Sequence, residues 1–218
     1  MREKNITMNN KKGLYQRFFK RVLDLILALI ALIVLSPVLL GVSILIKLKL
    51  GSPVLFKQDR PGYKGNIFTM YKFRTMTADV DNDGQLLPDA NRLTNLGKFL
   101  RSTSIDELPE LLNIIKGDMS IIGPRPLLVQ YLSLYNTYQF RRHDVKPGLS
   151  GKAQVNGRNC ISWNEKFDLD IEYIDNISFL GDVIIILKTI RKVFEREGVN
   201  SDITTTMEPF KGSEEREK

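Results

Sequence analysis

The chain has 218 residues, 43% of them hydrophobic, and a formal net charge of +7, which together fit one globular domain with an appendage. The single cysteine, Cys160, excludes an intramolecular disulfide and a cysteine-rich zinc site. The positive charge favours an anionic partner, which can be nucleic acid, a phosphorylated substrate or acidic lipid headgroups.

The first predicted element is an apolar helix that belongs in a membrane. Residues 25–46 carry no charge, and their 22 residues would form a helix about 33 Å long, against a hydrocarbon core of about 30 Å. A cleaved signal peptide fits poorly, because its apolar region would be shorter and would precede a small-residue cleavage site. Residues 1–13, before this segment, are predicted to form a flexible N-terminus.

The charges around this segment favour a re-entrant helix. Basic residues flank the apolar run on both sides, so the positive-inside rule would hold both ends in the cytoplasm. At the middle of the run, Pro37 removes a backbone hydrogen bond and the hydroxyl of Ser36 can bond a freed carbonyl, which predicts a bend at mid-depth. Residues 15–23 have the spacing of an interfacial helix. We therefore predict a re-entrant, monotopic anchor over 14–50, with an ordinary spanning helix as the alternative.

A basic β-hairpin is predicted next. Residues Val54 to Gln58 and Ile67 to Arg74 have strand composition, and a turn rich in proline and glycine joins them. The alternation in "YKFRTM" places Lys72 and Arg74 on one face, from which they could converge on a single anion. A solvated basic hairpin is the alternative interpretation.

A short helix is predicted within "SIDELPELLNIIKGDMSIIGPRP", residues 104–126. Its leucines and isoleucines recur at helical spacing up to Lys116, and Gly117 is the predicted stop. We prefer Asp106 as the N-cap, with Pro109 in the first turn, where a missing N–H costs little. A capping box is the alternative.

The capping box would be formed by Ser104 and Glu107. Either register puts the adjacent acids Asp106 and Glu107 at the positive end of a helix, where a phosphate would also be attracted. Capping alone would explain these acids unless the rest of the chain supplies a catalytic context.

The C-terminal third is predicted to contain a functional loop and two amphipathic helices. The segment "KPGLSGKAQVNGRN", residues 146–159, is interpreted as loop and turn, where Gln154 and Arg158 would suit a nucleotide. The helix that begins near Trp163 carries a core stripe, and the helix over 180–194 could lie on an acidic membrane surface. Residues 196–218 are predicted to be a polar tail. The predicted fold class is thus α+β: a re-entrant membrane helix, then a small, mainly helical cytoplasmic domain with a short hairpin and interfacial amphipathic helices.

Six motifs in order give the chain a family resemblance over roughly residues 15–195. They are the apolar run with its Ser-Pro pair, "KQDRPGYKG", "YKFRTM", "RSTSIDELPELLNIIKGDMSIIGPRP", "KPGLSGKAQVNGRN" and "YIDNISFLGD". The chain resembles the bacterial sugar transferases, the small monotopic phosphoglycosyl transferases that start N-glycan, capsule and exopolysaccharide assembly. One departure is Lys152, where many members of that family have an aromatic residue.

The resemblance implies a reaction. Residues 51–195 would transfer a sugar 1-phosphate, of an N-acetylated amino or deoxy-amino sugar, from a UDP-sugar to undecaprenyl phosphate and release UMP. Asp106 would be the nucleophile of a ping-pong mechanism, and Glu107, next to Asp106, would ligate Mg²⁺. The protein would lie on the cytoplasmic face of the bacterial inner membrane. A homodimer and downstream glycosyltransferases are possible partners. The residues implied or suited to bind phosphate or nucleotide are Lys72, Arg74, Arg101, Arg125, Gln154, Arg158 and Asp182.

Elementary electrostatics agrees with this assignment. A carboxylate that approaches a diphosphate meets like charge, which at 4 Å costs about 1 kcal/mol in water and about 4 kcal/mol at an effective dielectric of 20. A magnesium ion on Glu107, with Arg125 and Arg101, would neutralise that charge. Two alternatives remain open: a non-catalytic, membrane-anchored basic module that binds acidic lipid or a protein, and a direct transferase in which Asp106 is a base. Nucleic-acid binding is disfavoured, because the basic residues are scattered and form no known module.

Overall fold

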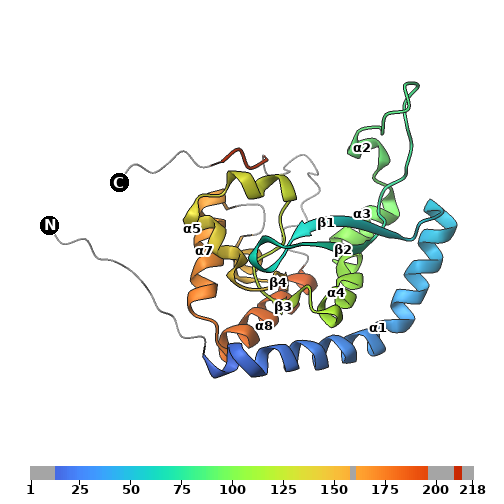
Figure 1. The fold of residues 1–218 in the computed structure, drawn as a ribbon. Coiled ribbons are helices and arrows are strands. Elements are labelled where there is room, and N and C mark those ends of the chain that lie inside the picture. Colours follow the sequence, from blue (N-terminus) through green and yellow to red (C-terminus); the bar gives the residue numbers. More distant parts are fainter. Residues whose placement is uncertain (1–12, 158–160, 196–208, 213–218) are drawn as a thin grey trace.

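The computed structural model describes residues 13–157, 161–195 and 209–212, so the predicted segments 1–13 and 196–218 lie almost wholly outside it. The chain is α+β and mostly helical, as predicted (Figure 1). The helices are α1 (Lys20–Leu50), α2 (Asp89–Arg92), α3 (Asn95–Ser102), α4 (Leu111–Lys116), α5 (Thr137–Phe140), α6 (Lys152–Asn156), α7 (Trp163–Asp175) and α8 (Phe179–Glu195). The strands are β1 (Leu55–Pro61), β2 (Ile67–Phe73), β3 (Ser120–Ile122) and β4 (Gly148–Ser150). Short 3₁₀ turns cover Tyr63–Gly65, Ile105–Glu110, Val129–Leu134 and Arg141–Asp144.

Helix α1 is long, apolar and bent in its middle, as Figure 1 shows. Pro37 lies inside the helix, and the hydroxyl of Ser36 donates to the carbonyl of Ile33 at 2.7 Å. That carbonyl, four residues before the proline, is the one that the missing N–H leaves unbonded. The predicted bend and its chemical cause are therefore confirmed. With a preceding π-helical turn the segment covers Tyr15–Leu50, and it is long and apolar enough to cross a membrane, with only 11% of its most apolar stretch buried.

The first half of α1 is fixed to the domain by polar side chains. The guanidinium of Arg21 donates to the carbonyls of Ile114 and Ile115 at 2.6 and 3.0 Å, at the C-terminal end of α4. The buried carboxylate of Asp24 accepts from the Ser120 hydroxyl at 2.7 Å and from the Ile121 N–H at 3.0 Å. Helix α1 and the domain therefore form one body, and α1 is not a loose tether.

The predicted hairpin is present, and β1 runs three residues further than expected. The two strands are antiparallel, with Phe56 opposite Lys72 and Arg60 opposite Phe68. The side chain of Asn113 in α4 is fully buried, accepts from the Tyr71 N–H at 3.1 Å and donates an N–H to the Thr69 carbonyl at 2.8 Å. This amide satisfies the edge of β2 and sets the distance between the hairpin and α4.

The segment before α4 differs from the prediction. Residues Ile105–Glu110 form a 3₁₀ turn that begins after Ser104, which has a left-handed φ of 56°, and α4 starts only at Leu111. Neither Asp106 nor Ser104 caps a helix with its side chain, so both predicted registers are wrong. The 3₁₀ turn separates both residues from the start of α4, and the side chain of Glu107 is held by Lys72 and Arg125. The predicted stop is confirmed, since Gly117 ends α4 with a φ of 96°.

Residues 146–159 were predicted to be loop and turn, and this is wrong for most of the segment. Strand β4 pairs in parallel with β3, and α6 follows. The glycines permit this close packing, because a Cβ on Gly148 would lie 2.1 Å from the Gly123 nitrogen, and one on Gly151 would lie 2.1 Å from the Gly123 oxygen. A glycine-rich composition here reflects close backbone approach.

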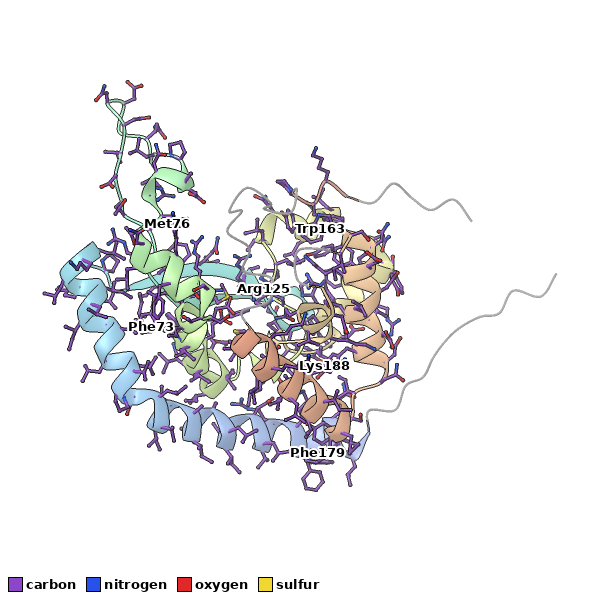
Figure 2. All side chains as sticks on the ribbon, turned by 180° about the vertical axis from the view of Figure 1, so that it is seen from behind. Phe73, Met76, Arg125, Trp163, Phe179 and Lys188 are labelled. Atoms are coloured by element: carbon purple, nitrogen blue, oxygen red, sulfur yellow. The ribbon has the colours of Figure 1, made fainter. Side chains whose placement is uncertain are left out.

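Helices α7 and α8 complete the domain. The predicted core stripe of α7 is confirmed, since Phe167, Ile171 and Ile174 are buried. Helix α8 lies beside the first half of α1 (Figure 1) and carries an exposed apolar row, as expected of an interfacial helix. The residues of this row are Phe179, Leu180, Ile184, Leu187 and Ile190. Phe179 points away from the domain in Figure 2, with its ring 5.8 Å from that of Tyr15.

Candidate active site

Two adjacent carboxylates in the 3₁₀ turn have opposite environments. Glu107 Oε1 accepts from Lys72 Nζ at 2.6 Å and from Arg125 Nη2 at 2.5 Å, and Arg125 Nη1 lies 3.5 Å from Glu107 Oε2. For the carboxylate of Asp106, by contrast, no hydrogen bond or ion pair is found among the described residues, although the residue is only 9% exposed. One acid of the pair is neutralised and the other is left available.

A third carboxylate, Glu110, belongs to the same cluster and was missed in the sequence analysis. Its side chain is 3% exposed, and Oε1 lies 3.2 Å from Lys72 Nζ without a hydrogen bond of good geometry. Lys72 therefore bridges Glu107 and Glu110. The spacing of three residues was the available signal, because residues three apart lie on one face of a 3₁₀ turn.

The three carboxylates titrate differently. Burial raises the pKa of Asp106 to about 6, and the charge of Glu107 adds to the effect. Burial, together with Glu107, likewise raises the pKa of Glu110 to about 7. Burial alone would raise the pKa of Glu107 too, but Arg125 and Lys72 hold it well below its ordinary value. At neutral pH, Glu107 is therefore ionised, Asp106 is mostly ionised, and Glu110 retains a share of a proton.

Arg125 is the most accessible cation of the cluster. It stands between Pro124 and Pro126 after β3, and its side chain is 43% exposed, near the centre of the domain in Figure 2. The prolines restrict the backbone, and Glu107 fixes one edge of the guanidinium. Its exposed edge is free to receive an anion such as a phosphate oxygen.

Arg60 is a second cation that the sequence analysis missed. The positive charge of Arg125 lowers the pKa of Arg60, after burial as the larger cause, so the two guanidinium groups are close in space. Its Nη2 donates to Gln58 Oε1 at 2.5 Å, while its Nε is buried without a partner among the described residues. The "KQDRPGYKG" motif contained this residue, and alternation along β1 was the signal that could have found it.

Lys72 and Arg74 were predicted to converge on a single anion, but only Lys72 lies at the acids. Arg74 donates to the carbonyls of Met76 and Ser52, both at 2.9 Å, at the base of the hairpin. Arg101 donates from Nε to Thr75 Oγ1 at 3.1 Å and lowers the pKa of Asp106, so it lies within electrostatic reach of that carboxylate.

Among the described residues, neither Gln154 nor Lys152 forms a hydrogen bond or ion pair with the acids. Gln154 donates to the Leu149 carbonyl at 3.3 Å within the β4–α6 turn, and its Oε1 is buried without a partner in the part of the chain that is described. Arg158 lies outside the described residues. Lys152, the departure from the family pattern, forms an ion pair with Glu172 at 2.5 Å.

Asp182 has a structural environment. Its buried carboxylate accepts from Lys20 Nζ at 2.6 Å and from the hydroxyls of Tyr15 and Tyr173, each at 2.8 Å. These contacts tie α8 to the start of the membrane helix and to α7. The structure thus gives Asp182 a role in fixing α1, away from the acids.

Comparison with known proteins decides the family. The family model described as bacterial sugar transferase matches residues 15–196. The chain belongs to the bacterial sugar transferase family. The resemblance seen in the sequence and the assignment as a transferase enzyme are therefore confirmed.

Three relatives illustrate the range of this sugar transferase's family. The chain is 54% identical to the uncharacterized sugar transferase EpsL of Bacillus subtilis over 194 residues, which cover 89% of this chain and 96% of EpsL. It is 39% identical to the exopolysaccharide production protein ExoY of Sinorhizobium fredii, over 80% of this chain and 84% of ExoY. It is also 39% identical to the UDP-glucose:undecaprenyl-phosphate glucose-1-phosphate transferase of Escherichia coli, over 82% of this chain but only 40% of that protein. The chain thus spans nearly all of some relatives and less than half of others.

The acids of this sugar transferase fit a magnesium ion. Within residues 13–157, 161–195 and 209–212, no group of three or more His, Cys, Asp or Glu side chains is arranged as a complete metal site. Magnesium commonly takes only one or two carboxylates and completes its shell with water and substrate phosphates. The oxygens of Asp106 and the weakly bonded Oε2 of Glu107 are hard donors of this kind.

Proposed function

We propose that this sugar transferase moves a sugar 1-phosphate from a UDP-sugar to undecaprenyl phosphate and releases UMP. Relatives named as UDP-glucose:undecaprenyl-phosphate glucose-1-phosphate transferase and undecaprenyl-phosphate galactose phosphotransferase support this reaction. The observation that carries the proposal is a contrast between two neighbouring acids. Asp106 is buried and has no partner among the described residues, whereas Glu107 is held by two cations. That arrangement suits a nucleophile beside a charge-compensated acid.

In the first step, an oxygen of Asp106 attacks the phosphorus that carries the sugar. A bond forms between that oxygen and phosphorus, the phosphorus–oxygen bond to UMP breaks, and UMP leaves with the electron pair. The carboxylate is suited to this attack because no ion pair competes for its lone pairs among the described residues. Arg125, with its exposed donors, binds non-bridging oxygens of the diphosphate and offsets the like-charge approach.

In the second step, a phosphate oxygen of undecaprenyl phosphate attacks the same phosphorus. The bond to Asp106 breaks, the carboxylate is restored, and undecaprenyl-diphospho-sugar leaves. The phosphate anion is already a nucleophile, so no side chain has to remove a proton. Mg²⁺, held by Glu107 and Asp106, would supply neutralisation of the phosphate charge. Two successive displacements at one carboxylate predict ping-pong kinetics.

The membrane arrangement is part of the proposal. We infer that α1 enters the inner membrane from the cytoplasmic side, bends at Pro37 and returns, while α8 lies in the interface. The bend, the basic residues on both flanks and the exposed apolar row of α8 support this topology. Cysteines placed at positions 9 and 95 should both react only with reagent from the cytoplasmic side. Labelling of position 9 from outside would establish a spanning helix instead.

The donor sugar is a finer part of the proposal. The donor predicted from the sequence carries an N-acetylated amino or deoxy-amino sugar. The relatives are named for glucose, galactose and N-acetylgalactosamine. A panel of UDP-sugars, scored by UMP release with undecaprenyl phosphate supplied, identifies the donor. A homodimer and contact with downstream glycosyltransferases remain predictions.

The reaction is tested by incubation with a UDP-sugar and Mg²⁺ in the absence of lipid. We expect a burst of UMP equal to the amount of enzyme and a mass increase on the peptide that contains Asp106. Asp106→Asn should lose both while it still binds membranes, and Asp89→Asn, at an exposed aspartate on α2, should keep both. UMP release that requires lipid, without a modified peptide, would favour the direct transferase. Absence of UMP release from every donor, even with lipid present, would favour the non-catalytic module.

A further inference from the structure

An apolar groove lies inside the bend of α1. Its volume is about 370 Å³, and it runs between both arms of α1, the base of the hairpin and the start of α4. The residues that line it are Leu32, Leu39, Ser43, Val54, Leu55, Phe73, Pro109 and Leu112. The hydroxyl of Ser43, the one polar side chain of this lining, donates to the Leu39 carbonyl at 2.7 Å. The groove therefore offers a hydrocarbon surface with no unsatisfied donor from its lining side chains.

One end of the groove borders the 3₁₀ turn that carries Asp106. Asp106 and Pro109 are three residues apart in the 3₁₀ turn, so they lie on the same face, one below the other. Leu112 follows three residues later at the start of α4 and continues this row. The row therefore begins at Asp106 and ends at two lining residues of the groove.

The other end of the groove leads to the exposed apolar surface of α1. Leu32 and Leu39 flank the bend and face the groove. Their neighbours Ile33 and Val34 are among the most exposed apolar side chains of the helix. A hydrocarbon chain can therefore leave the groove at the bend and continue along an apolar surface.

The size and charge distribution suit one kind of occupant. An apolar cavity of about 150 Å³ can hold benzene, which has six carbons, so about 370 Å³ has room for roughly fifteen carbons. Fifteen carbons correspond to three isoprene units. At the Asp106 end, Lys72 and Arg125 supply positive charge, and at the other end there is only hydrocarbon. The site thus matches a molecule with an anionic head and an isoprenoid tail.

We propose that this groove binds the first isoprene units of the polyprenyl phosphate acceptor, with the acceptor phosphate beside Lys72 and Asp106. This inference rests on the proposed function and assigns a subsite to its lipid substrate. The groove orients the acceptor phosphate for the second displacement, while the rest of the chain stays in the bilayer. It makes no contribution to UMP release in the first displacement.

The test compares two neighbouring leucines. Leu39→Trp fills the groove, whereas Leu40→Trp makes the same change on the exposed side of the same helix. The acceptors are dimethylallyl, geranyl, farnesyl and undecaprenyl phosphate at one fixed detergent concentration. For the wild type and Leu40→Trp, we expect KM to fall by about tenfold or more per isoprene unit up to farnesyl phosphate and then to level off. Leu39→Trp should lose most of this chain-length preference.

The outcomes separate the two proposals. Failure of the proposed function appears as no UMP release by the wild type from any donor. A normal UMP burst, together with the same chain-length preference in Leu39→Trp and Leu40→Trp, would overturn the groove assignment, and the groove would then hold ordinary membrane lipid. If Leu39→Trp misfolds and loses the UMP burst, the same comparison is made with Ser43→Leu, a substitution at another residue that lines the groove. The dependence of the wild-type KM on acceptor chain length is a second test. A KM that falls evenly beyond farnesyl phosphate would contradict a groove of limited length.

Discussion

Replacement of Asp106, the proposed nucleophile, should stabilise the protein while it abolishes the proposed reaction. The ionised carboxylate of Asp106 is buried without a partner in the described chain, and its pKa rises from 3.8 to about 6 in the folded protein. The folded state therefore holds the proton more tightly than the unfolded state. The favourable contribution is complete below pH 3.8 and is lost as the pH rises through about 6. At about 1.36 kcal/mol per pKa unit, an ionised Asp106 costs up to about 3 kcal/mol at pH 8.

Asp106→Asn removes that cost, because the amide does not ionise. For a chain of this size, a gain of about 3 kcal/mol raises Tm by roughly 6–12 °C, measured by thermal unfolding in detergent at pH 8. At pH 4 the gain should fall below about 1 kcal/mol, since Asp106 is then protonated in the folded wild type. Asp89→Asn is the control and should change stability by at most about 1 kcal/mol at either pH. A loss of stability in Asp106→Asn at pH 8, or a gain independent of pH, would refute the reasoning.

Three further predictions concern the titration of Asp106, the ion pair of Lys20 with Asp182, and Arg125. The rate of the UMP burst without lipid should fall about tenfold between pH 7 and pH 5, as Asp106 becomes protonated; a rate unchanged over this interval would contradict its raised pKa. Lys20→Met alone should cost about 3–5 kcal/mol in the free energy of unfolding, whereas Lys20→Met with Asp182→Leu should recover most of it, as chemical denaturation can measure. Arg125→Gln should slow the burst by about a hundredfold or more, and Arg74→Gln should slow it far less, in stopped-flow measurements of UMP.

The features predicted correctly depend on local chemistry. Pro37 must break one hydrogen bond wherever the helix lies, and Ser36 is the nearest hydroxyl that can compensate. The bend could therefore be predicted from these two residues alone. The apolar stripe of α7 and the strand alternation of the hairpin depend on spacing alone. The six motifs likewise identified the family without any structure.

The features that were missed depend on long-range contacts. The local pattern around Asp106 and Glu107 predicted a helix cap, because capping is the commonest local use of such residues, yet Glu107 is held by Lys72, 35 positions away in the chain. Arg74 lies one residue beyond β2, which ends at Phe73, and its guanidinium donates to the carbonyls of Met76 and Ser52. Alternation gives the direction of a side chain and does not give its partner.

Under the proposed topology, rigid contacts set the depth of Asp106 in the bilayer. Lys20, Arg21 and Asp24 fix the first arm of α1 to α8, α4 and β3, respectively. The 3₁₀ turn that carries Asp106 leads directly into α4, so Asp106 is held at a constant position relative to α1. A lipid phosphate diffuses in the plane of the headgroups, and a catalyst for it must hold its nucleophile in that plane. The ion pair of Lys20 with Asp182, remote from the acids, should therefore influence the second displacement more than the first. A slower transfer to lipid with a normal UMP burst in the Lys20→Met, Asp182→Leu protein would show that depth limits the reaction, and equal effects on both steps would show that it does not.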